Sequence, residues 1–182
     1  MSTRGCAIIL AIVVVVALAL PREHSAQAAS VALDARANPS QSLAIVVNRS
    51  NPINNLSFSE LRKIFMGDRN HWPNGHRIAI VMLEYGQPER RAVLRLIYRM
   101  DEKTYQDVLL RGMFRGDVFV APKTLASPTI VRKFVFNAPG GIGYLRASDV
   151  DESVKVIRID GLLPEDKGYR LQIDESSKAT DD

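Results

Sequence analysis

Three arginines recur at four-residue spacing in a segment predicted to be helical: Arg91, Arg95 and Arg99. Residues at this spacing share one face of a helix, and like charges there repel each other by a few tenths of a kcal/mol. An arginine face could bind an anion, because a guanidinium donates two parallel hydrogen bonds to a carboxylate or phosphate. The alternative is a solvated face that is partly paired with carboxylates such as Glu84 or Glu102, and this is the interpretation that we favour.

The loop at residues 68–76 holds a second group of residues with possible chemistry. Asp68, His71 and His76 lie close together in sequence and could ligate a metal ion. Three such residues in one polar loop are more often solvated, so we predict no metal site. Trp72 lies in the same loop, where it could line a ligand site or be pinned on the core.

The N-terminal segment indicates export. Arg4 precedes an unbroken run of fourteen Ala, Ile, Leu and Val residues, which ends at Leu20 and is followed by the small-residue site Ala26-Gln27-Ala28. This order is typical of a secretory signal peptide. The alternative is an uncleaved anchor, but the run reaches only about 21 Å as a helix, against roughly 30 Å of hydrocarbon. We therefore predict cleavage after residue 28 and no membrane span in the mature chain.

Composition and motifs argue against an enzyme. The one cysteine, Cys6, precedes the apolar run, so the predicted mature chain has no thiol nucleophile, disulfide or thiolate metal site. No Gly-x-Ser-x-Gly elbow and no phosphate-loop glycine pattern are present. The net charge of +4 is mildly basic, which favours an anionic ligand slightly but does not indicate nucleic acid. We predict no catalytic residues, no cofactor and no nucleic-acid partner.

Hydrophobic periodicity alternates between strand-like and helix-like segments along the mature chain. Strands are predicted at residues 43–48, 78–83, 142–145, 154–159 and 169–173, and helices at residues 58–65, 88–100, 102–114 and 128–136. Ser57 and Glu60 have the spacing of a capping box, and Gly67 follows as a stop signal. Pro88 and Ser127-Pro128 mark two further helix starts. Strands that alternate with helices predict an α/β domain whose sheet is mostly parallel and flanked by helices, with room for an antiparallel edge.

The order of these segments resembles the phosphate-binding component of ABC importers, a type II periplasmic solute-binding protein. The matching segments are LSFSELRKIFMGDRNHWPNG at residues 56–75, GGIGYL at residues 140–145 and GLLPEDKGYRL at residues 161–171. In that family a helix ends in Ile-Phe-x-Gly before a loop with a tryptophan, and a later strand contains Ile-Gly-Tyr. The resemblance spans about residues 43–173 and implies a single lobe of the periplasmic-binding-protein fold.

Two departures from the family bear on the ligand. The first lobe, with its Gly- and Ser-rich phosphate loop, has no counterpart in the predicted mature chain. The family's Ser-Gly-Thr turn, whose hydroxyls and N–H groups hold the anion, is replaced here by residues 85–89, where Pro88 lacks an N–H and Glu89 repels an anion. The candidate ligand-binding residues are Gly86, Gln87, Arg90, Arg91, Trp72 and Gly141. For Gly141, which follows Gly140, a plain tight turn is the alternative.

These observations predict a signal peptide at 1–28, a linker at 29–42, a periplasmic-binding-protein-like domain at 43–174 and a disordered tail at 175–182. The predicted protein is periplasmic or secreted, non-catalytic, and binds phosphate or a similar small oxyanion. A transporter or another envelope protein is its candidate protein partner. The first alternative is a degenerate lobe that has become a protein-interaction module. The second is a metal-assisted hydrolase that uses the loop with His71 and His76. Unchanged activity after mutation of both histidines would exclude this hydrolase.

Overall fold

The computed structural model describes residues 41–115 and 121–173. In chain order the elements are β1 (Leu43–Val47), β2 (Asn55–Leu56), α2 (Phe58–Met66), β3 (Ala79–Leu83), α3 (Pro88–Val93), the π-helix η2 (Leu94–Tyr98), α4 (Glu102–Arg115), β4 (Lys123–Leu125), α5 (Pro128–Asn137), β5 (Gly141–Arg146), the 3-10 helix η3 (Ala147–Asp149), β6 (Lys155–Val156) and β7 (Arg158–Ile159). The predicted signal peptide, residues 29–40 of the predicted linker and the predicted tail at 175–182 lie outside the described residues.

Five strands form the main sheet, in the order β4-β3-β5-β1-β6, and β2 pairs with β7 separately. β3 runs parallel to both β4 and β5, whereas β1 is antiparallel to β5 and to β6. Four of the five strands therefore point the same way, and β1 alone is reversed. The predicted α/β class with a mostly parallel sheet is confirmed. The antiparallel strand that we expected at an edge lies instead between two other strands.

β1 is the most completely buried strand. All five of its residues, Leu-Ala-Ile-Val-Val, have no exposed surface. A strand that is covered on both faces favours such a continuous apolar run over an alternating one. Asn48 follows the strand, and its Nδ2 donates to the carbonyl oxygens of Val135 (2.9 Å) and Phe136 (2.6 Å) near the end of α5. The predicted strand is confirmed.

The boundaries of α2 follow from its capping residues. The Ser57 side chain accepts a hydrogen bond from the Glu60 N–H, and the Glu60 carboxylate accepts one from the Ser57 N–H. This reciprocal pair satisfies two backbone donors that a helix start would leave without partners. Gly67 ends the helix with φ of 86°, a left-handed conformation that favours glycine. Leu61, Ile64 and Phe65 are buried, as the helical periodicity predicts.

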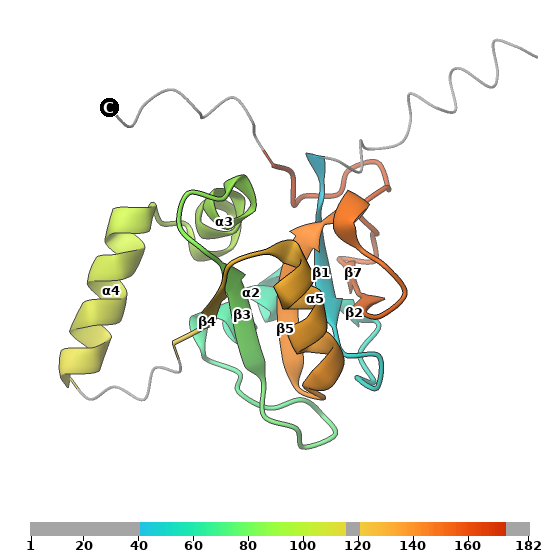
Figure 1. Ribbon diagram of the computed structural model, residues 1–182, viewed down its shortest axis with the longest axis horizontal. Coiled ribbons are helices and arrows are strands. Elements are labelled where there is room, and N and C mark those ends of the chain that lie inside the picture. The colour runs from blue at the N-terminus through green and yellow to red at the C-terminus, as the bar shows by residue number, and fades with distance from the viewer. Residues whose placement is uncertain (1–40, 116–120, 174–182) are drawn as a thin grey trace, which may run out of the picture. The chain divides into compact units, whose positions relative to one another are not determined.

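The helices cover both faces of the sheet, with α5 in front of β5 and α2 behind the sheet in Figure 1. Two positions of β5 that face neighbouring elements have no side chain, Gly141 next to α5 and Gly143 next to α5 and β3. A Cβ on Gly143 would lie 2.7 Å from Cγ2 of Val81 and 3.1 Å from Cγ1 of Val131. A Cβ on Gly141 would lie 3.2 Å from Cα of Val135 in α5. Close packing of helix on strand thus explains both glycines.

Three predicted elements differ from the structure. The strand predicted at 154–159 is two short strands, because Ile157 donates its N–H to Ile45 of β1 whereas Arg158 donates to Asn54 beside β2. The helix predicted at 88–100 continues from α3 into the π-helix η2 and ends at Tyr98.

The strand predicted at 169–173 is also wrong, although its alternation is real. Tyr169, Leu171 and Ile173 are all buried, and the segment makes one antiparallel bridge, between Gln172 and Ser42. Leu43 donates its N–H to the Leu171 carbonyl, and the Tyr169 hydroxyl donates to the Leu43 carbonyl. The segment therefore covers the start of β1 without forming a strand. Within residues 41–115 and 121–173, no helix is both long and apolar enough to cross a membrane.

Candidate functional site

The turn between β3 and α3, together with the first residues of α3, holds four of the six candidate residues. β3 ends at Leu83, and Tyr85 and Gly86 are exposed. Gly86 has φ of 85°, in the left-handed region, which explains a glycine at this point of the turn. Gln87 is the N-cap of α3, and its side chain makes no capping hydrogen bond. The turn therefore contains an exposed glycine, Gly86, and the side-chain amide of Gln87, which makes no capping hydrogen bond.

Arg90 is buried behind this turn and bonded on every side. Its Nε and Nη2 each donate to Glu102 of α4 at 2.8 Å, a bidentate pair, and its Nη1 donates to the Leu83 carbonyl at 2.8 Å. The guanidinium also lies over the Tyr105 ring, 5.4 Å from the ring centre. All three nitrogen atoms thus have protein acceptors. Arg90 joins the end of β3 to the start of α4, and its role in ligand binding stays a prediction.

The ion pair sets the protonation of both partners. Burial raises the pKa of the Glu102 carboxyl, but the hydrogen bonds and the charge of Arg90 outweigh burial and hold this pKa below its ordinary value. Burial lowers the pKa of the Arg90 guanidinium, and Glu102 more than offsets this effect. The pair is therefore fully charged near neutral pH. The sequence suggested Glu102 as a partner for the arginine stripe, and the structure assigns it to Arg90.

Glu89 is the second buried charge of α3. It is 5% exposed and forms an ion pair with Nε of Arg146, at the end of β5. From the sequence we expected Glu89 to repel an anion at the turn. Because Arg146 offsets its charge within the domain, this repulsion is smaller than expected.

The predicted arginine stripe is only partly solvated. Arg95 and Arg99 are exposed, whereas Arg91 is half-buried and donates from Nη1 to the Gly86 carbonyl at 2.8 Å. The buried Nε of Arg91 has no hydrogen-bond partner among the described residues. Arg91 is thus the candidate arginine that retains an unused donor next to the turn.

Trp72 and Gly141 lie at the other end of the sheet. Trp72 is 2% exposed, and its Nε1 donates to the Gly140 carbonyl at 3.0 Å. Gly141 pairs with Ala79, the first residue of β3, whereas the turn follows the last residue of that strand. Five residues of strand span about 16 Å. The six candidate residues therefore fall into two separate groups, and Trp72 serves as a core anchor for its loop.

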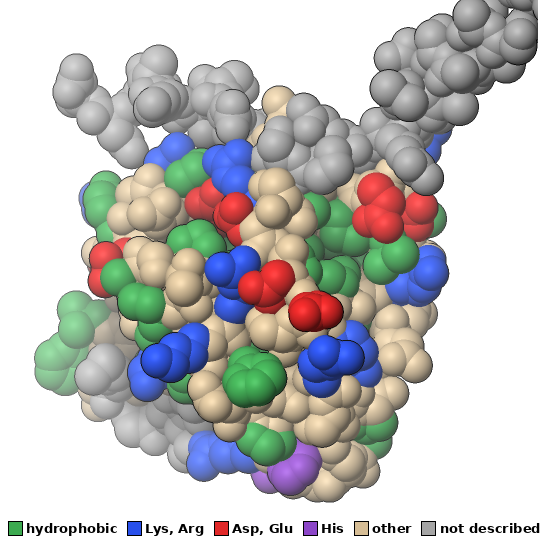
Figure 2. All heavy atoms as spheres, turned by 45° about the vertical axis from the view of Figure 1, so that its right-hand side comes forward, with side chains coloured by type: hydrophobic (Ala, Val, Ile, Leu, Met, Phe, Trp, Pro, Cys, Tyr) green, Lys and Arg blue, Asp and Glu red, His purple; other side chains and the backbone are tan. Residues whose placement is uncertain are grey.

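The metal interpretation gains no support from the loop at 68–76. His71 Nδ1 lies 2.8 Å from Asn70 Oδ1, and His71 forms a backbone bridge with Arg77. Among the described residues, no three His, Cys, Asp or Glu side chains come together as metal ligands. On the face shown in Figure 2, basic and acidic side chains are interspersed, so the positive net charge is not concentrated there.

Comparisons with known proteins agree with the resemblance seen in the sequence. The chain matches no protein-family model. It is 28% identical over 141 residues to the phosphate-binding protein PstS of Bacillus subtilis (strain 168). The aligned segment covers 74% of this chain and 43% of that protein. The chain is thus similar in sequence to a phosphate-binding protein of the PstS type.

Solved structures show the same fold. An ABC-type phosphate transport receptor from Vibrio cholerae superposes with a TM-score of 0.56 at 24% identity, over 71% of this chain and 50% of that one. PstS from Borrelia burgdorferi gives a TM-score of 0.54 at 14% identity, over 68% of this chain and 49% of that one. The chain spans half the length or less of these relatives, as a single lobe would.

Sequence reasoning missed Arg146, the residue that offsets the charge of Glu89 next to the turn. Arg146 is the last residue of β5, directly after Gly-Ile-Gly-Tyr-Leu, and its position at the end of a parallel strand beside β3 could have signalled that it lies near α3. It also missed β4, whose three residues are too few for a periodic signal, and the groove beside that strand.

Proposed function

We propose that this protein is an exported, non-catalytic solute-binding lobe that offers one wall of a site for phosphate or a similar small oxyanion. The wall is the β3–α3 turn with Gly86, Gln87 and Arg91. The observation that carries the proposal is the position of this turn at the carboxyl end of parallel strands, where open α/β sheets bind ligands, in a chain similar to a phosphate-binding protein.

The chemistry of the turn favours an anion. Arg91 has a buried Nε without a partner among the described residues, and Gln87 has an uncapped side chain with amide donors. Glu89, in the first turn of α3, is paired with Arg146, so its negative charge is offset within the domain. Glu84, which is exposed at the start of the turn, is the acidic residue that opposes an anion there.

We expect the affinity to be low. Tight sites for small molecules bury most of the ligand, and one wall leaves much of an anion in water. We therefore predict a dissociation constant for phosphate of about 1 mM or weaker, equivalent to about −4 kcal/mol. If a second copy or a partner supplies the other wall, the affinity rises with protein concentration or on adding that partner.

Titration with inorganic phosphate at low salt, followed by calorimetry and by amide shifts in NMR spectra, tests this proposal. Shifts should concentrate at Gly86 and Gln87, and Arg91→Ala should weaken them, whereas Lys103→Ala, an exposed control on α4, should not. A micromolar constant would restore an autonomous site, and the absence of any saturable shift would remove the oxyanion function.

An envelope protein-interaction module is the second candidate function. It is favoured by the internal use of Arg90 and Glu89, which leaves fewer charges for a ligand, and by exposed apolar side chains. Tyr85 is 69% exposed, and Leu110 and Phe114 on α4 are 55% and 84% exposed. If phosphate causes no saturable change, this function becomes the leading one.

Both candidate functions place the protein in the periplasm or outside the cell. The purified envelope fraction should contain a chain that begins at Ala29 or Ser30, because the predicted cleavage site ends at Ala28 or, with a shifted cut, at Ala29. N-terminal sequencing checks this, and an intact Met1 or Ser2 would indicate an anchored protein instead.

A further inference from the structure

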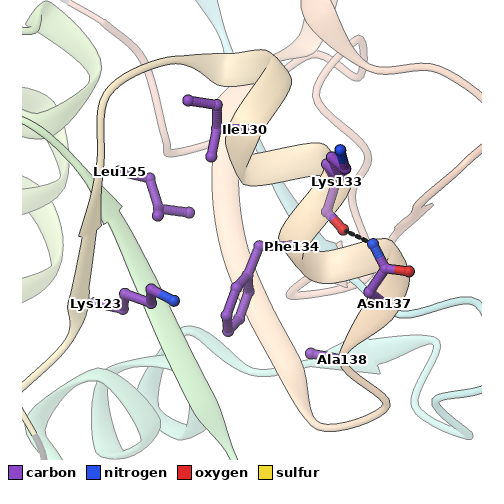
Figure 3. A pocket seen from close by; sticks show the side chains of 7 residues that line it. All are labelled: Lys123, Leu125, Ile130, Lys133, Phe134, Asn137 and Ala138. Atoms are coloured by element: carbon purple, nitrogen blue, oxygen red, sulfur yellow. Dashed lines mark hydrogen bonds between the residues drawn. The ribbon is translucent and has the colours of Figure 1, made fainter.

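A shallow groove lies between the edge strand β4 and helix α5, on the sheet face that α5 covers. Its volume is about 340 Å³. The groove is lined by Lys123 and Leu125 on β4 and by Ile130, Lys133 and Phe134 on α5. In Figure 3, Ile130 and Phe134 point toward β4, whereas Lys133 lies on the side of α5 that is turned away from β4. Leu125 and Phe134 are half-buried and Ile130 is 44% exposed, so the floor is apolar and open to solvent.

The charges around this floor are all positive. Lys123 and Lys133 are exposed, and no carboxylate lines the groove. Lys123 lies over the Phe134 ring, with Nζ 5.0 Å from the ring centre. Neither lysine forms an ion pair with a carboxylate in residues 41–115 or 121–173. The groove therefore combines an apolar floor with two ammonium groups that have no internal counter-charge in that part of the chain.

β4 also offers backbone groups along the groove. Among the described residues it pairs with β3 alone. The Leu125 carbonyl accepts from the Glu84 N–H on the β3 side, and neighbouring residues of a strand direct their N–H and C=O groups to opposite edges. Thr124, which is exposed, therefore directs its N–H and C=O away from β3, where an added strand can pair.

We propose that the β4–α5 groove is a docking site for an extended segment of a partner protein, with an apolar side chain flanked by carboxylates. The segment adds a strand beside β4. Alternate side chains of a strand point to the same face, about 7 Å apart, so one apolar residue enters the floor while acidic residues on either side meet Lys123 and Lys133. This site is separate from the proposed oxyanion wall and does not depend on it.

Charge decides between this occupant and a second copy of the chain. Pairing two β4 edges would bring the lysines of both copies to one seam, and edge lysines commonly prevent such association. An acidic segment has the opposite effect, because it supplies the counter-charges that both lysines lack among the described residues. Electrostatic complementarity of this kind mainly sets which partner is accepted.

The test uses two end-blocked fluorescent peptides, Thr-Glu-Thr-Leu-Thr-Glu-Thr and the same peptide with lysine in place of glutamate. Fluorescence anisotropy with the whole protein should show saturable binding of the acidic peptide and none of the basic one. Lys123→Glu combined with Lys133→Glu should reverse this preference, with a change of at least about tenfold for each peptide. Lys63→Glu, an exposed control on α2, should leave it unchanged.

The strand-pairing part of the proposal is tested separately. Thr124→Pro removes an outward N–H without affecting the bonds to β3 and should abolish binding of the acidic peptide. An acidic peptide N-methylated along one edge serves the same purpose on the unmodified protein, in case the proline variant does not fold. Equal binding of both peptides, unchanged binding after N-methylation, or concentration-dependent self-association without peptide binding would each overturn the proposal.

Discussion

Helices α3 and α5 both follow a parallel strand of the sheet, and both have a proline in the first turn. Some of their charged residues are nevertheless used in different ways. In α3, Glu89 and Arg90 are buried and paired with Arg146 and Glu102, which lie 57 and 12 residues away in sequence. In α5, Arg132 forms an ion pair with Asp151 at 3.2 Å, whereas Lys133 is exposed and has no carboxylate partner among the described residues.

The difference between Arg90 and Lys133 shows that a basic residue on a helix says little about ligand binding by itself. What matters is whether a distant segment brings a counter-charge to it. Arg90 has such a partner and attaches α4 to the rest of the domain, whereas the charged side chain of Lys133 is exposed to solvent. Experiments on the two helices should accordingly give effects of different kinds, on stability for α3 and on recognition for α5.

The largest expected effect is that of Arg90→Ala. The substitution leaves Glu102, whose side chain is 16% exposed, without its bidentate partner, and it leaves the Leu83 carbonyl without a donor. Breaking such a pair from one side should cost about 3 kcal/mol of unfolding free energy. Lys133→Ala, the matched change on α5, should stay within about 0.5 kcal/mol. Urea denaturation measures both, and equal effects would remove the contrast.

The same ion pair gives a pH dependence. The folded-state pKa of Glu102 is held below its ordinary value, so the pair contributes stability above that ordinary value and loses it as the pH falls through the lowered pKa. Thermal melts between pH 7 and pH 3 should show this loss in the unmodified protein. Glu102→Gln should remove that part of the pH dependence, and an identical pH profile would show that other carboxylates dominate.

A smaller effect is expected where α5 packs on β5. Gly143→Ala introduces a Cβ that would lie 2.7 Å from the Val81 side chain, closer than real Cβ contacts, so neighbouring groups must shift. Overpacking of this kind typically costs about 1–3 kcal/mol. The denaturant midpoint measures this loss, and an unchanged midpoint for Gly143→Ala would show that Val81 of β3 and Val131 of α5 can move away from the added Cβ without cost.

The smallest effect concerns the two helix starts. The Ser127 hydroxyl accepts a hydrogen bond from the Ile130 N–H, whereas the Gln87 side chain makes no capping bond. Ser127→Ala should therefore cost about 1 kcal/mol and Gln87→Ala only a few tenths. Thermal unfolding of the two variants side by side measures the difference. A larger loss for Gln87→Ala would mean that its side chain has a structural role.

The sequence correctly predicted the elements whose stability depends on residues close to each other in the chain. Ser57 and Glu60 define the start of α2 because both partners lie in one turn, and the apolar run of β1 follows from burial on two faces. The errors arose where distant contacts decide. The segment at 154–159 divides because Ile157 bonds to β1 and Arg158 bonds near β2, and no periodicity records that change of partner.

Only part of the candidate site was predictable, because its residues come from segments that are far apart in the chain. The glycine-containing turn at 85–89 was located correctly at the end of a strand, because turn residues act locally. Trp72 and Gly141 were grouped with it by resemblance, yet they lie at the opposite end of β3 and β5. Their separation depends on the direction of the parallel strands, and the types of the individual residues do not reveal that direction.

The reversed strand β1 also has a kinetic consequence. It is the first strand among the described residues, yet it pairs with β5, whose residues follow roughly a hundred positions later. Contacts between residues so far apart in sequence slow folding. The hydroxyl of Tyr169 bonds to Leu43 across 126 residues, so the last described segment closes over the first. Nearly the whole domain must be synthesised before β1 has both of its neighbours, β5 and β6. We therefore expect the domain to fold in milliseconds to seconds, as a late and concerted event.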